Sequence, residues 1–288
     1  MIIVNLKGGT GNQLFQYALG RHLAIKNKDT LKFDVSGLAR AKQVGDVYRP
    51  LALNLLAVKV DLATEAEVKK IKYHFGLLSK AWLFIKTKIL RQFNIIFNPK
   101  YLDLRGDVYL DGFWQSPLYF EAIREVLVKE LTLNKLMSGE ALAYQVQIQN
   151  TNSISLHIRR GDYTKNRRVK KEYGSCSPTY YEQAVAQIKK TVPSPTFFIF
   201  SDDIAWVKTN QTINEKIVFI EAKEVTDIEE VLLMSQCQHN IIANSSFSWW
   251  GAWLNQNLDK IVIAPTPWFN KSTYDKNLIP LTWIQLPK

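Results

Sequence analysis

Two adjacent arginines followed by a glycine and an acid are the residues of this chain best suited to chemistry. Arg159, Arg160, Gly161 and Asp162 stand at the end of a short apolar run at 154–158. A guanidinium is a planar fork of N–H donors that matches phosphate oxygens and stays charged at physiological pH. The segment therefore fits a diphosphate site, and it fits equally well an arginine–aspartate pair that only tightens a turn.

A glycine-rich turn at 8–11 follows the apolar run at 2–6 near the start of the chain. Backbone N–H groups of such a turn can approach an anion closely, and Asn12 and Gln13 add two amides at the start of the next helix. The turn does not match a dinucleotide fingerprint, because Leu14 occupies the place of a glycine or alanine. A tight turn without a ligand is the alternative interpretation.

Two further groups of polar residues follow apolar runs in the second half of the chain. Asp202 and Asp203 end the run at 197–201, where an aspartate can contact a guanine base, bind Mg²⁺ or cap the next helix. The run at 240–244 leads into a serine-rich helix start, which can bind an anion through hydroxyl and N–H groups. Its members are Ser245, Ser246, Phe247 and Ser248.

Length and composition restrict the class of protein. The chain has 288 residues, of which 47% are hydrophobic, and this length allows two domains with cores of their own. No run of about 18 apolar residues predicts a transmembrane helix. Nothing at the start marks the chain for secretion. Cys176 and Cys237 are too few for a disulfide framework, which favours a reducing, cytoplasmic location. The histidines and cysteines form no metal-binding motif, so no metal is expected.

The formal net charge of +11 is concentrated between residues 68 and 102, which include eight lysines and arginines and no acid. Apolar residues recur there at helical spacing. The pattern predicts a basic amphipathic helix that either packs on the core or makes peripheral contact with an anionic membrane. Nucleic-acid binding also fits the net charge, but no nucleic-acid-binding motif accompanies it, so we expect no such partner.

Apolar runs alternate with helical patterns through the second half of the chain, which predicts parallel βαβ units covered on both faces. The predicted strands are 154–158, 197–201, 217–221, 240–244 and 261–264, and the helices are 178–190, 227–236 and 247–257. The first half begins in the same way, with strands at 2–6 and 31–34 around a helix at 12–26, and it has a further strand at 108–111. The polar stretch 145–152 predicts a boundary between two domains, 1–150 and 151–288.

Five segments in order resemble those of the bacterial α-1,2-fucosyltransferases of glycosyltransferase family 11. They are Gly-Gly-Thr-Gly-Asn-Gln-Leu-Phe-Gln-Tyr at 8–17, Asp-Gly-Phe-Trp-Gln-Ser at 111–116, His-Ile-Arg-Arg-Gly-Asp-Tyr at 157–163, Phe-Ser-Asp-Asp at 200–203 and Asn-Ser-Ser-Phe-Ser-Trp-Trp-Gly-Ala-Trp at 244–253. The resemblance implies an α/β, GT-B-like fold, in which two Rossmann-type domains face each other across a cleft. The domain 1–150 would take the acceptor, and the domain 151–288 would bind GDP-fucose.

The activity that the resemblance implies is an inverting, metal-independent transfer of L-fucose. The donor would be GDP-β-L-fucose, and the acceptor the 2-hydroxyl of a galactose-containing glycan in cell-surface glycan synthesis, with lipid-linked glycans among the acceptors. Two other classes of function remain as alternatives. One is a nicotinamide-dependent oxidoreductase, suggested by the glycine turn. The other is a non-catalytic basic protein that binds membrane or nucleic acid through residues 68–102.

The resemblance also assigns roles to residues of the donor site. Arg159 matches the arginine that binds the diphosphate, and Arg160 supports it or binds a phosphate itself. Asp202 matches the position that reads guanine, and His157 lies against the nucleoside. Four residues match the loop around the phosphates: Ser245, Ser246, Phe247 and Ser248.

Gly11 and Asn12 would face the sugar and the acceptor from the N-terminal domain. The residue that removes the proton from the acceptor hydroxyl stays open. Asp162 is the carboxylate nearest to the arginines in sequence, and Asp111 is another candidate. Asn12 is too weak a base but could position the hydroxyl. Arginine together with a helix start can stabilise a leaving diphosphate without a metal, by several kcal/mol.

Overall fold

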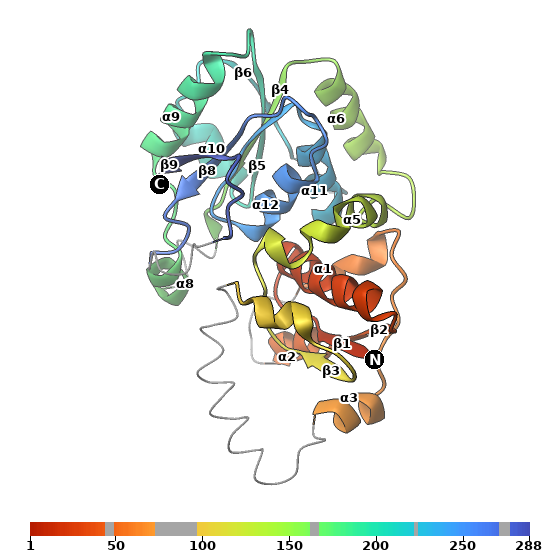
Figure 1. Ribbon diagram of the computed structural model, residues 1–288. Helices are drawn as coiled ribbons and strands as arrows, with labels where there is room; N and C mark the ends of the chain where they lie inside the picture. The colour runs from red at the N-terminus through yellow and green to blue at the C-terminus, as the bar shows by residue number, and fades with distance from the viewer. Residues whose placement is uncertain (44–48, 73–96, 162–166, 222–223, 271–276) are drawn as a thin grey trace. The chain divides into compact units, whose positions relative to one another are not determined.

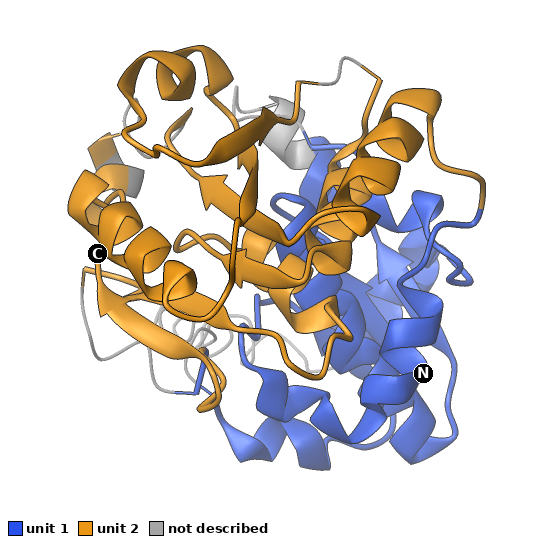
Figure 2. Cartoon of the chain, turned by 90° about the horizontal axis from the view of Figure 1, so that it is seen from above, with its two compact units in different colours: residues 1–134, 276–278 blue, residues 135–275, 279–288 orange. Residues whose placement is uncertain are grey.

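The computed structural model describes residues 1–43, 49–72, 97–161, 167–221, 224–270 and 277–288 (Figure 1). The chain divides into two compact units, coloured separately in Figure 2. Unit 1 contains residues 1–134 and 276–278, and unit 2 contains residues 135–275 and 279–288. Asp162 and most of the basic segment predicted over 68–102 lie outside the described residues, so the predicted membrane contact stays a prediction.

Unit 1 is built on a three-stranded parallel sheet in the order β2-β1-β3. β1 (Ile2–Asn5), α1 (Thr10–Asn27) and β2 (Leu31–Asp34) form a βαβ unit, and β3 (Val108–Leu110) joins the free side of β1. These elements confirm the strands and the helix predicted for the first half. The other elements within the described part of unit 1 are α2 (Ser36–Gln43), η1 (Ala52–Leu55), α3 (Glu65–Lys72), η2 (Pro99–Asp103), η3 (Pro117–Tyr119), η4 (Glu121–Ile123) and α5 (Arg124–Glu130).

Unit 2 is built on a six-stranded parallel sheet in the order β6-β5-β4-β7-β8-β9. Numbered within the unit this is 3-2-1-4-5-6, the strand order of a Rossmann sheet. The strands are β4 (Ser153–Ile158), β5 (Thr196–Ser201), β6 (Lys216–Phe219), β7 (His239–Ile241), β8 (Val262–Thr266) and β9 (Ile284–Pro287). The helices are α6 (Gly139–Gln149), α8 (Arg167–Glu172), α9 (Pro178–Lys189), α10 (Ile204–Asn210), α11 (Asp227–Gln236) and α12 (Ser246–Leu254). All five predicted strands and three predicted helices of this half are confirmed, and β9 is an addition.

The sheet of unit 2 is covered on both faces, as its apolar strands require (Figure 1). On one face Phe197 and Ile199 of β5 pack with α9 and α10, and on the other Phe198 and Phe200 pack with α6 and α11. Alternate residues of a strand point to opposite faces, so both faces of β5 are filled by one uninterrupted apolar run. The sheet is therefore a rigid base for the residues at its carboxyl edge.

The two units divide at residues 134 and 135, which is earlier than the boundary predicted at 150. The polar stretch that suggested that boundary is largely the last turns of α6, not a linker. α6 belongs to unit 2 because Ala141 and Ile148 are buried in its core, while its polar residues face outward or bond to α11. Gln145 donates to Gln236 across 2.8 Å, and Glu229 accepts from the backbone N–H of Ser138 across 2.6 Å.

Among the residues that the structure describes, no helix is long and apolar enough to cross a membrane.

The packing of α12 on α11 depends on a residue without a side chain. A Cβ added to Gly251 of α12 would stand 2.6 Å from Cβ of Met234 in α11, which is closer than real carbon atoms approach. We therefore expect Gly251→Ala to push the two helices apart and to lower the free energy of unfolding by about 1–3 kcal/mol. Urea denaturation measures this change.

Gly139, the first residue of α6, is the matched control, since a Cβ there meets nothing within 4 Å. Gly139→Ala is expected to leave stability unchanged or to raise it slightly by restricting the unfolded chain. Equal stability of the two variants would contradict the close packing of α11 and α12.

Candidate active site

The predicted site residues of unit 2 gather where the strand order of its sheet reverses. From β4 the chain proceeds outward through β5 and β6, then returns to place β7 on the other side of β4. The carboxyl ends of β4 and β7 therefore lie next to each other. After β4 the chain continues to one face of the sheet, and after β7 it continues to the other. Ligands of open α/β sheets bind in the crevice at such a point. Arg159 follows β4 there, and Ser245 precedes α12 after β7.

The turn after β4 is held by the acid that ends β5. Nη1 of Arg159 lies 3.2 Å from Oδ2 of Asp202, and the backbone N–H of Arg160 donates to Oδ1 of Asp202 across 2.8 Å. β4 and β5 are parallel neighbours, with Ile158 opposite Ser201, so the register brings these residues together. An arginine–aspartate pair thus exists at this turn with Asp202, a residue distant in sequence, while Asp162, the acid of the predicted pair, lies outside the described residues.

Gly161 completes this turn because a side chain there would occupy the place of the carboxylate. A Cβ at Gly161 would stand 2.3 Å from Oδ2 of Asp202. Burial raises the pKa of Asp202, but the charge of Arg159 and the N–H groups of Arg160 and Gly161 outweigh it, so the pKa lies below its usual range. Asp202 is therefore ionised and aims the guanidinium of Arg159.

Arg160 has surroundings different from those of Arg159. Its guanidinium lies over the ring of Trp206, 3.4 Å from the centroid, and its Nε is 3.5 Å from Oδ2 of Asp203. Asp203 also caps α10 by accepting from the N–H of Trp206 across 3.3 Å. Of the three roles considered for the acids after β5, helix capping is therefore confirmed for Asp203. The contacts of Arg160 fit a supporting role for the turn better than a phosphate ligand.

His157 is the buried centre of the site. Its Nδ1 shares a hydrogen bond of 2.8 Å with Oγ of Ser248, and its ring packs against Phe247 with the centroids 5.6 Å apart. Burial lowers the pKa of His157 to about 3, and the charge of Arg159 acts in the same direction. The ring is therefore neutral, and it links the end of β4 to the first turn of α12.

The four predicted residues at the start of α12 divide into two pairs. Ser246 and Phe247 are partly exposed, whereas Ser245 and Ser248 are buried. Ser245 is the N-cap of α12, because its side chain accepts from the N–H of Phe247. The hydroxyl of Ser248 faces His157 and the interior. The helix start can thus offer an anion its backbone N–H groups and the hydroxyl of Ser246.

Glu230 of α11 is a neighbour of the site that the sequence analysis missed. Burial, and then the negative charges of Asp227 and Asp202, raise its pKa to about 8. Its carboxyl group makes no hydrogen bond with any described residue of the chain. A signal was available, since Glu230 stands four residues before Met234 and seven before Cys237, both of them buried. An acid on the apolar stripe of a helix near a strand end points to a functional site.

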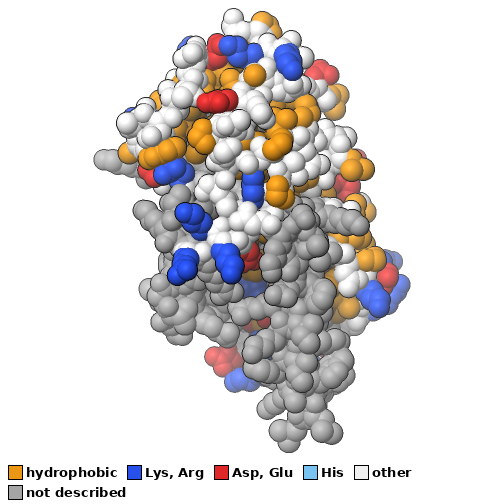
Figure 3. Space-filling view, turned by 90° about the vertical axis from the view of Figure 1, so that its left-hand side faces the viewer, with side chains coloured by type: hydrophobic (Ala, Val, Ile, Leu, Met, Phe, Trp, Pro, Cys, Tyr) orange, Lys and Arg blue, Asp and Glu red, His pale blue; other side chains and the backbone are white. Residues whose placement is uncertain are grey.

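Basic side chains continue beyond the arginine turn. α8 exposes Arg167, Lys170 and Lys171, and it lies on the side of unit 2 that Figure 3 presents, where several Lys and Arg side chains gather at mid-height. A positive surface beside a site raises the encounter rate with an anionic ligand.

The structure places the predicted residues of unit 1 at the carboxyl edge of its own sheet. Gly11 and Asn12 lie in the first turn of α1, and Oδ1 of Asn12 accepts from Gln115 across 2.7 Å. Asp111 follows β3 and forms an ion pair with Lys7. Asp162, the other candidate base, lies outside the described residues.

Among the described residues, no group of three or more His, Cys, Asp or Glu side chains is arranged to hold a metal ion.

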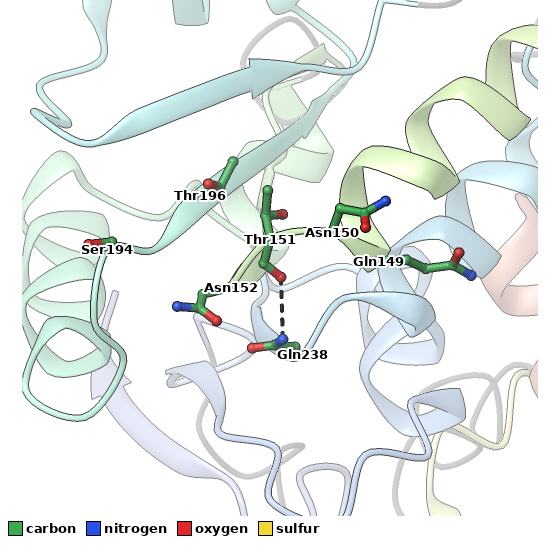
Figure 4. Close-up of a pocket in the computed structure, with 7 residues that line it drawn as sticks. All are labelled: Gln149, Asn150, Thr151, Asn152, Ser194, Thr196 and Gln238. Carbon is green, nitrogen blue, oxygen red and sulfur yellow. Dashed lines mark hydrogen bonds between the residues drawn. The ribbon is translucent and has the colours of Figure 1, made fainter.

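A hollow of about 460 Å³ lies at the opposite, amino-terminal edge of the sheet of unit 2 (Figure 4). Its lining is uncharged: Gln149, Asn150, Thr151, Asn152, Ser194, Thr196 and Gln238. The amide of Gln238 donates to the Thr151 carbonyl, and that of Asn152 donates to the Pro193 carbonyl. These donors serve the backbone, and none of the predicted site residues lines the hollow. The candidate site is therefore at the other edge.

The Rossmann strand order of unit 2 places the chain among the α/β proteins with parallel, doubly covered sheets. Similarity to known proteins narrows this class. The sequence matches the family described as Glycosyl transferase family 11 over residues 1–286. The chain therefore belongs to glycosyl transferase family 11, which does not favour the oxidoreductase or the non-catalytic alternative.

Two relatives and one solved structure extend this finding. The chain is 34% identical over 295 residues to an alpha-1,2-colitosyltransferase of Escherichia coli, a match that spans 100% of this chain and 99% of the relative. It is 32% identical over 301 residues to the Escherichia coli O-antigen biosynthesis glycosyltransferase WbnK, spanning 98% and 99%. The structure of NodZ alpha-1,6-fucosyltransferase soaked with GDP-fucose is similar in fold, with a TM-score of 0.52 and 12% identity over 88% of this chain and 91% of that one.

The buried neutral His157 makes stability depend on pH. The unfolded chain binds a proton at this histidine below about pH 6.5, whereas the folded chain binds it only near pH 3. The contribution of His157 is therefore complete above pH 6.5 and is lost as the pH falls, by about 1.4 kcal/mol per pH unit.

We expect His157→Asn, whose amide can still bond to Ser248, to flatten the decline of unfolding free energy between pH 6.5 and pH 4.5. Denaturant titrations of both proteins at several pH values measure this, and the other titrating groups are common to the two. Parallel pH profiles would show that His157 is not held neutral.

Proposed function

We propose that this protein is an inverting glycosyltransferase that transfers L-fucose from GDP-β-L-fucose to the 2-hydroxyl of a galactoside. The observation that carries the proposal is the position of Arg159, which Asp202 holds beside the start of α12 at the point where the strand order reverses. Family membership and the printed activities of the relatives support the reaction class. Acceptors in O-antigen or other cell-surface glycans follow from the relative named for O-antigen biosynthesis.

Arg159 and the N–H groups at the start of α12 would bind the diphosphate of the donor. When the bond between the sugar and the diphosphate breaks, negative charge grows on the leaving phosphate, and fixed N–H donors stabilise it without reorganising. A guanidinium and a helix start thereby replace a metal ion, so we propose a metal-independent reaction. Arg160, stacked on Trp206 and beside Asp203, would keep the turn in place.

The nucleoside would lie near His157, Phe247 and the acids beside them. Guanine presents two neighbouring N–H donors, which a carboxylate accepts well. Asp202 is ionised but already accepts from Arg159 and from the turn. Glu230 has no hydrogen bond within the described chain, but its raised pKa keeps it largely protonated near pH 7, so it would accept from guanine only after losing its proton. The base that takes the acceptor proton stays open between Asp162 and Asp111, with Asn12 as a positioning group. The cleft between two facing domains also stays a prediction.

Transfer of colitose is the second candidate function, because a relative that spans the whole chain is an alpha-1,2-colitosyltransferase. Colitose is fucose without the 3-hydroxyl group. A site that hydrogen-bonds this hydroxyl discriminates strongly against the deoxy sugar, whereas a site without such a bond does not. The two donors therefore give a direct test.

A donor and acceptor screen tests the proposed function. The purified protein is incubated with GDP-fucose or GDP-colitose and a panel of β-galactosides, with EDTA present. We expect release of GDP and an α-1,2-linked fucosyl product, identified by NMR, with kcat/KM at least about 10-fold higher for GDP-fucose. A higher kcat/KM for GDP-colitose would favour the second candidate. Absence of transfer from either donor would contradict both.

A further inference from the structure

The carboxyl edge of the unit 1 sheet carries a polar cluster that the donor site leaves unused. β1 and β3 are parallel neighbours, with Val4 opposite Leu110, so the next residues along, Asn5 and Asp111, stand side by side. Nδ2 of Asn5 donates to Oδ1 of Asp111 across 3.2 Å, and Nζ of Lys7 donates to the same oxygen. Two donors from the end of β1 thus fix the carboxylate that follows β3.

This carboxylate is fixed but remains accessible. The side chain of Asp111 is 40% exposed, and that of Lys7 is 25% exposed. A carboxylate has about four acceptor positions, and the exposed part of this one can meet a ligand hydroxyl while Asn5 and Lys7 orient it. Lys7 balances its charge, which makes the pair suited to neutral hydroxyl groups.

An aromatic ring and an amide belong to the same loop and glycine turn as Asp111 and Lys7. The partly exposed ring of Phe113 lies 5.1 Å from Nζ of Lys7. Asn12 accepts from Gln115 through Oδ1, which turns its donor end, Nδ2, toward Gly8. A Cβ at Gly8 would stand 2.8 Å from this nitrogen, and φ at Gly8 is +79°, so a glycine keeps the donor uncovered.

A carboxylate, an amide donor and an aromatic face in one cluster are the groups that bind a pyranose. Carbohydrate hydroxyls donate and accept hydrogen bonds, and aromatic side chains commonly line ligand sites. The loop at 111–116 is held next to the residues of the glycine turn by Gln16. Its Nε2 donates to the carbonyls of both Lys7 and Gly112, across 3.2 Å and 3.0 Å.

We infer that Asp111 is an acceptor-binding residue. It accepts a hydrogen bond from a hydroxyl of a neutral acceptor sugar, Nδ2 of Asn12 donates to a neighbouring hydroxyl, and Phe113 contacts the ring of the same sugar. The inference rests on the proposed glycosyl transfer and adds the residues that select the acceptor. It assigns Asp111 to binding in place of the proton removal left open above, so the effect of its loss falls on the KM of the acceptor.

Asp111→Asn is the direct test, measured as the KM and kcat of transfer to a β-galactoside at saturating GDP-fucose. Because a hydrogen bond to a charged group is lost, we expect the acceptor KM to rise about 10-fold or more. The kcat, the KM of the donor and the slow hydrolysis of donor by water stay within about 2-fold of wild type. Asp111→Glu is expected to restore part of the acceptor affinity.

Asp107→Asn is the matched control. Asp107 immediately precedes β3, is 53% exposed and pairs with the N-terminal ammonium group, so it lies at the opposite edge of the same sheet. We expect this variant to keep the wild-type acceptor KM. Thermal unfolding of each variant shows whether the fold is kept. Should Asp111→Asn fail to fold, Phe113→Leu replaces it, with an expected rise of acceptor KM of about 3-fold or more against a near wild-type Phe113→Tyr.

The outcomes separate this inference from the proposed function. If wild-type protein transfers no sugar, the proposed function fails. If it transfers sugar and Asp111→Asn keeps the wild-type acceptor KM, the inference is overturned. A fall of kcat at unchanged acceptor KM also overturns it, because that result would place Asp111 in the proton transfer.

Discussion

The pairing of Arg159 with Asp202 is the constraint on which the candidate donor site depends. An arginine at the end of a buried strand is stable only opposite a negative charge, and here the adjacent parallel strand supplies it. The same carboxylate accepts from the backbone of Arg160, which shapes the turn. The charge of the guanidinium is thus partly balanced in the free protein while the guanidinium stays at the surface of the site. A diphosphate can then add to an arginine that is already oriented.

The protonation states of the buried groups around Arg159 and Asp202 depend on this pair. His157 stays neutral because it is surrounded by protein and lies near the positive charge of Arg159. Its hydrogen bond with Ser248 ties the first turn of α12 to β4, so the helix start and the arginine keep their relative positions. The pKa of Glu230 shifts in the opposite direction, because burial and then the negative charges of Asp227 and Asp202 raise it. One small region therefore holds a neutral imidazole, an ionised carboxylate and a carboxyl group of raised pKa, as functional sites commonly do.

The sequence allowed most of unit 2 to be predicted because its strands are rich in apolar residues and most of its helices have clear caps. α11, for example, begins after Thr226 with a reciprocal capping box to Glu229 and coincides with the predicted range. β9 was missed because it is an exposed edge strand that ends in a proline. The stretch 145–152 resembles a boundary because polar residues outnumber the two buried positions of α6, whose last turns it contains. The partner of Arg159 could not be read from spacing, since Asp202 reaches it only through the register of β4 and β5.

The central claim is that Arg159 binds the diphosphate of a guanine nucleotide, and calorimetric titration with GDP tests it most directly. Arg159→Lys keeps the charge opposite Asp202 but loses the planar fork, so it separates recognition from folding. Arg124→Ala, a variant of an arginine in unit 1, is the control. The account predicts that the Kd for GDP weakens about 10-fold or more in Arg159→Lys and stays within 2-fold in Arg124→Ala. Equal Kd values for wild type and Arg159→Lys would contradict it.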